Sequence, residues 1–483
     1  MPRPVIQCAR LPHDLVDLVL KEISDDRKTL EHCSLVCWEW SRAAGPYIFS
    51  PFSWPPCSTK IVGGYCEKDP RFAEDSSFTV LLQSLASSPR LCHSIRKLTL
   101  SHHDSDCAYG VSENDGSLYS TFFRIISFLP NLRILTLNGD NIGPLSSDDL
   151  DFIKDHTVDV RTLSLSCSIS AVPYLLCAFR SVSRLVLRCL DVPNQPLIPR
   201  AQLSQLKVQY VNISLSSPAE VVMSVLQHCL DITAIRHLTW HSEHSVASHP
   251  RMLDIIADMS SLESVTHDLV RSCQSSGIHR EPLVHPQLRS ITLRGKLGLL
   301  SVKHSWAQRR EYISNGLPDR SLEELLEEPL SAIRGGGVDD SSWQAILEDL
   351  RILVSPMTRD LTIRLTLAQQ YEGGPDAGGD DDDDEWYVWD ETPAHGVRAL
   401  RKGLSAVDWA GLQAAVARST ALQSVRFVIE FPGAVPYHDC VEILRRHLAL
   451  HLSEDVMGKV QFVDETDSRL LLTMYEKVVV AVW

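Results

Sequence analysis

A short phrase of apolar residues recurs along the middle of the chain, and it constrains the fold more than any other feature. In this phrase a first apolar residue is followed three places later by a second one, and two places after that by a third. Copies occur at Ile95/Leu98/Leu100, Leu132/Leu135/Leu137, Val160/Leu163/Leu165, Val182/Leu185/Leu187, Leu203/Leu206/Val208, Ile235/Leu238/Trp240 and Leu288/Ile291/Leu293, with a weaker copy at Leu262/Val265/His267 and a distant one at Leu422/Val425/Phe427. Because the last two positions alternate as in a β-strand, both side chains are expected to face one core.

The spacing of these copies resembles that of leucine-rich repeats. The third position falls at residues 100, 137, 165, 187, 208, 240, 267 and 293, and most intervals lie in or near the 20–29 residues typical of that family. Helical segments fit between the copies, for instance at residues 120–128 and 218–230. We therefore predict an α/β solenoid in which parallel strands alternate with helices. The alternative is an ordinary apolar-rich α/β protein, in which the same phrase is common.

The resemblance to leucine-rich repeats is partial at the turn that follows each strand. In that family an Asn or Cys three places after the phrase bonds the turning backbone. The corresponding residues of this chain are His103, Asp140, Ser168, Leu190, Val211, Glu243 and Lys296. None of them is Asn or Cys, so the backbone must be satisfied in another way. We expect an irregular, degenerate solenoid.

The first fifty residues carry a different apolar pattern. Leu11-Pro12 opens a predicted helix, since Pro suits the first helical turn. The apolar stripe of this helix consists of Leu15, Leu18, Val19 and Ile23, widened by Val16 and Leu20. Further apolar clusters follow at Leu30, at Leu35-Val36-Cys37 and at Trp40.

These residues resemble an F-box. The pattern of that family is Leu-Pro-x-acid-Leu, spaced aliphatic residues, a Leu, and then Leu-Val-Cys-x-x-Trp. The chain has Leu11-Pro12-His13-Asp14-Leu15, then Val19, Ile23 and Leu30, then Leu35-Val36-Cys37-Trp38-Glu39-Trp40, and its segment Gly45-Pro46-Tyr47-Ile48-Phe49 resembles the closing helix. The resemblance implies a three-helix unit that binds a Skp-type adaptor, which in turn docks on a cullin carrying a RING subunit.

The resemblance also implies which side chains face the adaptor or shape that face. They are Leu11, Pro12, Leu15, Val19, Leu30, Leu35, Val36 and Trp40. About forty residues cannot bury enough surface to be stable alone, and the surplus of large apolar side chains suggests a shared interface. Trp38 departs from the basic or polar residue usual at its position, and it is either an extra contact or an anchor on the first repeat. The competing interpretation is a helical cap on the solenoid.

The acidity of the chain is local. Its formal net charge of −15 comes from 46 basic and 61 acidic residues, and residues 372–391 hold acids without any Lys or Arg. A nucleic-acid partner, which requires a basic footprint, is therefore not expected. The sequence has no run of about 18 apolar residues that would predict a membrane span, and no signal-peptide core. Because its 13 cysteines form no C-x-x-C pair, we expect a protein of the cytosol or nucleus.

No residues suggest catalysis, and we expect no cofactor or metal. A zinc module would need a second pair beside Cys33 and Cys37. The cluster of His237, His241, His244 and His249 around Glu243 is interpreted as a strand end and an exposed loop rather than a metal site. The acidic run at residues 380–385 is interpreted as a solvated loop, with calcium or a basic partner as alternatives. A hydrolase hidden in residues 295–483 is the weakest alternative.

We predict three parts: an F-box at residues 1–50, an irregular connector at 51–90 with a helix at 76–88, and the solenoid at 91–483 with a disordered acidic loop at about 372–385. Further helices are predicted at 321–328, 341–354, 406–419 and 437–452, and further strands at 360–367 and 477–483. The predicted function is a non-catalytic substrate receptor of a Skp–cullin–F-box ubiquitin ligase that holds a target protein on its solenoid. The alternative is a repeat scaffold without an adaptor.

Overall fold

The computed structural model describes the chain in segments. They are residues 12–24, 26–54, 60–62, 65–67, 78–102, 123–139, 158–167, 172–176, 178–189, 205–215, 226–242, 250–269, 283, 285–297, 322–327, 329, 341–367, 397, 400–401, 403–405, 407–430 and 437–463. Leu11, the acidic loop at 372–385 and the predicted strand at 477–483 lie outside these residues.

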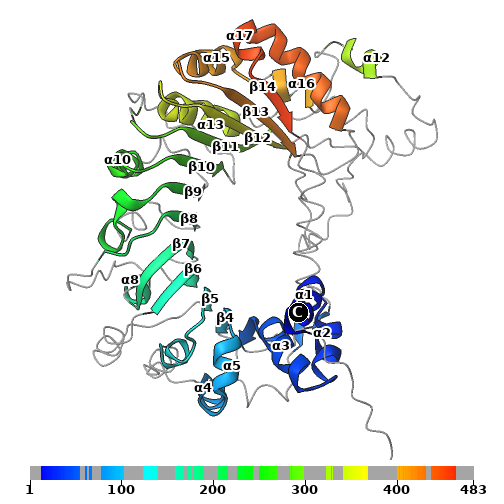
Figure 1. Ribbon diagram of the computed structural model, residues 1–483. Coiled ribbons are helices and arrows are strands. Elements are labelled where there is room, and N and C mark those ends of the chain that lie inside the picture. The colour runs from blue at the N-terminus through cyan, green and yellow to red at the C-terminus, as the bar shows by residue number, and fades with distance from the viewer. Residues whose placement is uncertain are drawn as a thin grey trace, which may run out of the picture. The chain divides into compact units, whose positions relative to one another are not determined.

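The fold is α/β, with three N-terminal helices followed by an all-parallel, solenoid-like sheet of twelve strands interleaved with helices (Figure 1). The strand order is β1-β4-β5-β6-β7-β8-β9-β10-β11-β12-β13-β14, which follows the order along the chain. The chain splits into two compact units. The first takes in the described residues of Met1–Gln209 and Ser224–Asp231, and the second those of Tyr210–Met223 and Ile232–Val482.

The first unit begins with three helices and continues into the sheet. Its helices are α1 (His13–Glu22), α2 (Arg27–Ser34), α3 (Trp38–Ile48), α4 (Phe78–Ser87), α5 (Pro89–Ser94) and α8 (Val172–Leu176). Its parallel strands are β1 (Pro51–Trp54), β4 (Lys97–His102), β5 (Ile134–Gly139), β6 (Val158–Cys167) and β7 (Phe179–Cys189). A separate antiparallel pair joins β2 (Lys60–Val62) to β3 (Tyr65–Glu67).

The second unit repeats the alternation of strand and helix. Its strands are β8 (Tyr210–Leu215), β9 (His237–Ser242), β10 (Ser264–Leu269), β11 (Ser290–Leu297), β12 (Asp360–Leu367), β13 (Ser424–Glu430) and β14 (Val460–Val463). Its helices are η2 (Ile232–Ala234), α10 (Pro250–Asp258), α12 (Leu322–Glu327), α13 (Ser341–Leu353), α15 (Trp409–Ala417), α16 (Tyr437–His451) and α17 (Glu454–Met457). The helices predicted at 321–328, 341–354, 406–419 and 437–452 are thereby confirmed, as are the helix predicted at 76–88 and the strand predicted at 360–367.

The recurring phrase forms the core because the strands pair in register. In the first unit Leu98, Leu135, Leu163 and Leu185 stand opposite one another on successive strands, and all are buried. In β10 burial alternates along the strand, with every second side chain buried and the others half-buried. Stacking one such row on the next removes a continuous apolar surface from water, which a single repeat cannot do.

Two repeats differ from the sequence prediction. The predicted phrase Leu203/Leu206/Val208 was wrong, because strand β8 begins later and places Val211 opposite Leu238. The residues in the phrase positions are therefore Val208, Val211 and Ile213, all buried. A further repeat at Thr358/Leu361/Ile363 was missed because its first position is polar. The buried Thr358 hydroxyl accepts a hydrogen bond from Ser355 N at 3.0 Å.

A backbone ladder holds the beginnings of the strands. The carbonyl of Arg96, one residue before β4, accepts the N–H groups of Arg133 at 2.8 Å and Ile134 at 3.0 Å. The Arg133 carbonyl in turn accepts those of Arg161 and Thr162. In the second unit the same arrangement recurs at the carbonyls of Arg236, Glu263, Arg289 and Arg359. The backbone groups before these strands are thus hydrogen-bonded by the backbone of the neighbouring repeat.

One phrase position holds a buried ionisable pair. His267 stands in β10 where neighbouring repeats have Trp240 and Leu293, and its Nδ1 lies 2.6 Å from Asp349 Oδ2 on α13. Both side chains are fully buried. An ionisable group is excluded from an apolar core unless a partner compensates its lost hydration. The pair therefore fixes how α13 lies against this strand.

We expect His267→Leu and Asp349→Leu to destabilise the chain by at least about 2 kcal/mol each, because each leaves its partner without this hydrogen bond. The double variant should lose less than the sum of the two, with a coupling energy of about 1–3 kcal/mol. Urea unfolding of the four proteins measures this cycle. Strictly additive losses would show that the pair is not coupled.

Candidate functional site

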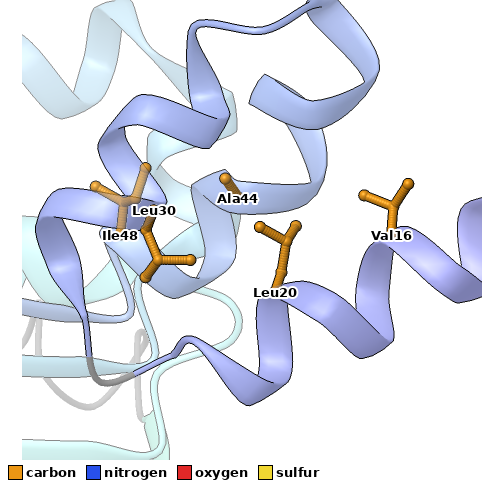
Figure 2. Close-up of a cluster of buried hydrophobic side chains, with 5 residues drawn as sticks. All are labelled: Val16, Leu20, Leu30, Ala44 and Ile48. Carbon is orange, nitrogen blue, oxygen red and sulfur yellow. The ribbon is translucent and has the colours of Figure 1, made fainter.

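The three N-terminal helices form a small unit with a core of its own. This core consists of Val16 and Leu20 on α1, Leu30 on α2, and Ala44 and Ile48 on α3 (Figure 2). All five are buried, and Trp40 and Tyr47 pack partly buried around them. Asp26 begins α2 by accepting a hydrogen bond from Thr29 N at 3.1 Å. This core is small, as expected for about forty residues.

Five further large apolar side chains of the same helices are exposed. Leu15, Leu18 and Val19 on α1 are each 45–56% exposed, although they belong to the same predicted stripe. Between α2 and α3, Leu35 is 81% exposed and Val36 is 67% exposed. Large apolar side chains are rarely grouped on a free surface unless something covers them. We call these five residues the apolar face.

The structure separates the residues that the sequence prediction grouped together. Leu30 and Trp40 belong to the internal core, whereas Pro12, Leu15, Val19, Leu35 and Val36 are exposed. Leu18 belongs to the apolar face but was not among the predicted site residues. Its place in the predicted helical stripe was the signal that could have found it. Leu11 lies outside the described residues.

The helical unit is joined closely to the first repeat. α3 ends at Ile48, and the next residues lead directly into β1. The Ser50 carbonyl accepts the N–H groups of Arg96 at 3.3 Å and Lys97 at 2.7 Å, so the backbone ladder begins at this junction. The Arg90 guanidinium of α5 stacks over the Trp38 ring, 4.5 Å from its centroid, a cation–π contact. Of the two roles predicted for Trp38, this contact fits the anchor on the first repeat.

In the second unit the sheet face opposite the buried phrase is polar. Thr239, Thr266, Thr292 and Thr362 form a half-buried row in register. Beside this row, the ring of Tyr210 stacks on that of His237 with centroids 4.2 Å apart. Such a face presents hydroxyl and aromatic groups along successive strands.

A charged cluster lies on the same polar face. Asp268 Oδ2 is 3.1 Å from His241 Nδ1 and accepts a hydrogen bond from Arg294 at 3.0 Å. Burial raises the pKa of the Asp268 carboxyl, but the hydrogen bond from His241 and the charge of Arg294 outweigh burial, so its pKa lies below the ordinary value. Asp268 is therefore a negative charge held between His241 and Arg294.

The histidines that crowd the sequence near residue 240 have separate partners. His237 Nδ1 lies 2.7 Å from Ser264 Oγ, and His241 contacts Asp268. His244, His249 and Glu243 lie outside the described residues. Within the described segments, no three His, Cys, Asp or Glu side chains gather as a metal site would require. None of the helices described there has the length and apolar character to cross a membrane.

Comparison of the chain with models of known protein families gives no match, and comparison with curated proteins gives none either.

The division between core and apolar face predicts different responses to truncation. Leu20→Ala should lower the free energy of unfolding by about 2–5 kcal/mol because it empties a fully buried position. Leu18→Ala removes the same atoms from an exposed position of the same helix, so its effect should stay below about 1 kcal/mol. Urea unfolding followed by tryptophan fluorescence compares them. Equal losses would mean that α1 does not face the core as described.

Proposed function

We propose that the protein is a substrate-receptor subunit of a Skp–cullin–F-box ubiquitin ligase. In this proposal the apolar face of the helical unit binds a Skp-type adaptor, and through it the cullin and RING subunits. The solenoid holds a target protein, and the chain itself catalyses no reaction. The ligase would act in the cytosol or nucleus.

The observation that carries the proposal is the apolar face. The helical unit has its own core of Val16, Leu20, Leu30, Ala44 and Ile48, so Leu15, Leu18, Val19, Leu35 and Val36 are not needed to close it. Five large apolar side chains on a unit of this size match the hydrophobic centre of a protein interface, where aliphatic anchors become desolvated. Four of them, Leu15, Val19, Leu35 and Val36, are positions at which the sequence resembles an F-box.

The polar face of the second unit supports the other half of the proposal. The threonine row and the cluster of His241, Asp268 and Arg294 present polar groups along successive strands. A repeat surface of this kind can contact an extended partner at several points. We assign target binding to this polar face.

A second candidate function is a repeat scaffold whose helical unit serves only as a cap. The observation that favours it is the junction, where Ser50 and Trp38 connect the helices to the first repeat. The apolar face distinguishes the two functions, because a cap has no use for an exposed apolar surface.

Binding to a purified Skp-type adaptor tests the proposal. Leu15→Ala/Val19→Ala and Leu35→Ala/Val36→Ala should each weaken the adaptor complex by about tenfold or more, since truncating interface anchors commonly costs over about 1 kcal/mol each. Leu450→Ala, at a 79% exposed position on α16, is the matched control and should leave binding unchanged. The proposal fails if both double variants bind the adaptor as tightly as the unaltered chain. The scaffold function then stands.

A further inference from the structure

A cavity of about 930 Å³ lies in the first unit between the helices and the beginnings of the strands. One wall is formed by α1 and α3, with Asp17, Glu39 and Arg42 among its side chains. The opposite wall is formed at the beginnings of β4 and β5 and contains Arg96, Lys97 and Arg133. Cavities that hold small molecules have volumes of about 300–1,000 Å³, so this cavity has a suitable size. None of its side chains belongs to the apolar face.

The charged side chains of the strand wall are all basic, which contrasts with the acidic chain around it. Arg96, Lys97 and Arg133 come from neighbouring repeats, and the cavity as a whole has four cationic side chains against two carboxylates. The formal net charge of the chain is −15. Among the described residues, no carboxylate forms an ion pair with the side chain of Arg42, Arg96, Lys97 or Arg133.

The ladder brings these cations together. Arg96 and Arg133 occupy the same position of the phrase, immediately before their strands, and Arg161 continues the row one repeat further. Like charges on directly neighbouring strands repel each other. These side chains are exposed, so solvent screens part of the repulsion, and an anion bound between the guanidinium groups would relieve the rest.

We propose that this cavity binds a small phosphomonoester that carries hydroxyl groups, the class to which sugar phosphates belong. Arginine guanidinium groups match phosphate oxygens with parallel N–H donors, and Lys97 adds a point charge. The phosphate therefore lies against the strand wall. This inference is independent of adaptor binding.

The helical wall selects the rest of the ligand. Asp17 and Glu39 carry only acceptors when ionised, so they bind hydroxyl donors and repel further negative charge. Arg42 is the one cation among the charged residues named on this wall, and a peptide rich in Asp and Glu would still meet the like charges of Asp17 and Glu39. A hydroxylated phosphomonoester satisfies both walls. The ligand contacts the helical wall and the strand wall at once. It therefore also stabilises the junction between the helices and the first repeats.

Isothermal titration of the full chain with glucose 6-phosphate tests the proposal. Glucose, inorganic phosphate and a hexapeptide of alternating Asp and Glu serve as comparison ligands. We expect glucose 6-phosphate to bind most tightly, inorganic phosphate to bind more weakly and compete with it, and glucose not to bind. The proposal is overturned if glucose 6-phosphate does not bind, if glucose binds equally well, or if the acidic peptide binds more tightly.

Variants then locate the site. Arg96→Gln/Arg133→Gln removes two charges from the strand wall and should weaken glucose 6-phosphate binding by about tenfold or more. Arg289→Gln/Arg359→Gln changes the same phrase position in the second unit, also at exposed residues, and should leave the affinity unchanged. Asp17→Asn should retain phosphate binding but reduce the preference for glucose 6-phosphate. Equal losses in both arginine pairs would assign the binding to general surface charge and overturn the site.

Discussion

The structure depends on the backbone ladder at the beginnings of the strands. At seven junctions the carbonyl that precedes a strand accepts two N–H groups of the next repeat, as the Arg96 carbonyl does for Arg133 and Ile134. This contact fixes the register of one strand on the next, and a slip of one residue would move every apolar side chain to the opposite face. The buried row that contains Leu98 and Leu135, the threonine row of the second unit and the arginine row of the first all follow from this register.

The ladder also explains why the helical unit can present a surface. Its first acceptor is the Ser50 carbonyl, two residues after α3 ends, so this helix is tied to the first repeat by main-chain bonds and by the Trp38–Arg90 contact. With its own small core and this junction, the unit is ordered without using Leu15, Val19, Leu35 or Val36. These apolar side chains are consequently available to a partner.

Much of this fold could be predicted from the sequence because the apolar phrase depends on local periodicity. The register of β8 could not be predicted, since Leu206 and Val208 have the same spacing as the last two residues of the phrase. Only the pairing with β9 shows that Val211 and Ile213 occupy those positions. Thr358 was missed because a hydrogen-bonded hydroxyl can fill an apolar position. On α1 the helix was correctly predicted, but its stripe of Leu15, Leu18 and Val19 is exposed. The core is formed instead by Val16 and Leu20, which the sequence analysis had placed at the margin of that stripe. The basic cavity could not be predicted from the sequence, because its side chains come together only when the strands pair.

The most direct test of the central claim is amide hydrogen exchange of the full chain with and without a Skp-type adaptor. If the apolar face is the docking surface, exchange should slow in α1 and in the segment around Leu35 and Val36, because a bound partner protects the amides it covers. Exchange in β8–β13 of the second unit should not change. The account is contradicted if the adaptor slows exchange only in the strands, or if it leaves α1 unprotected at concentrations that saturate the complex.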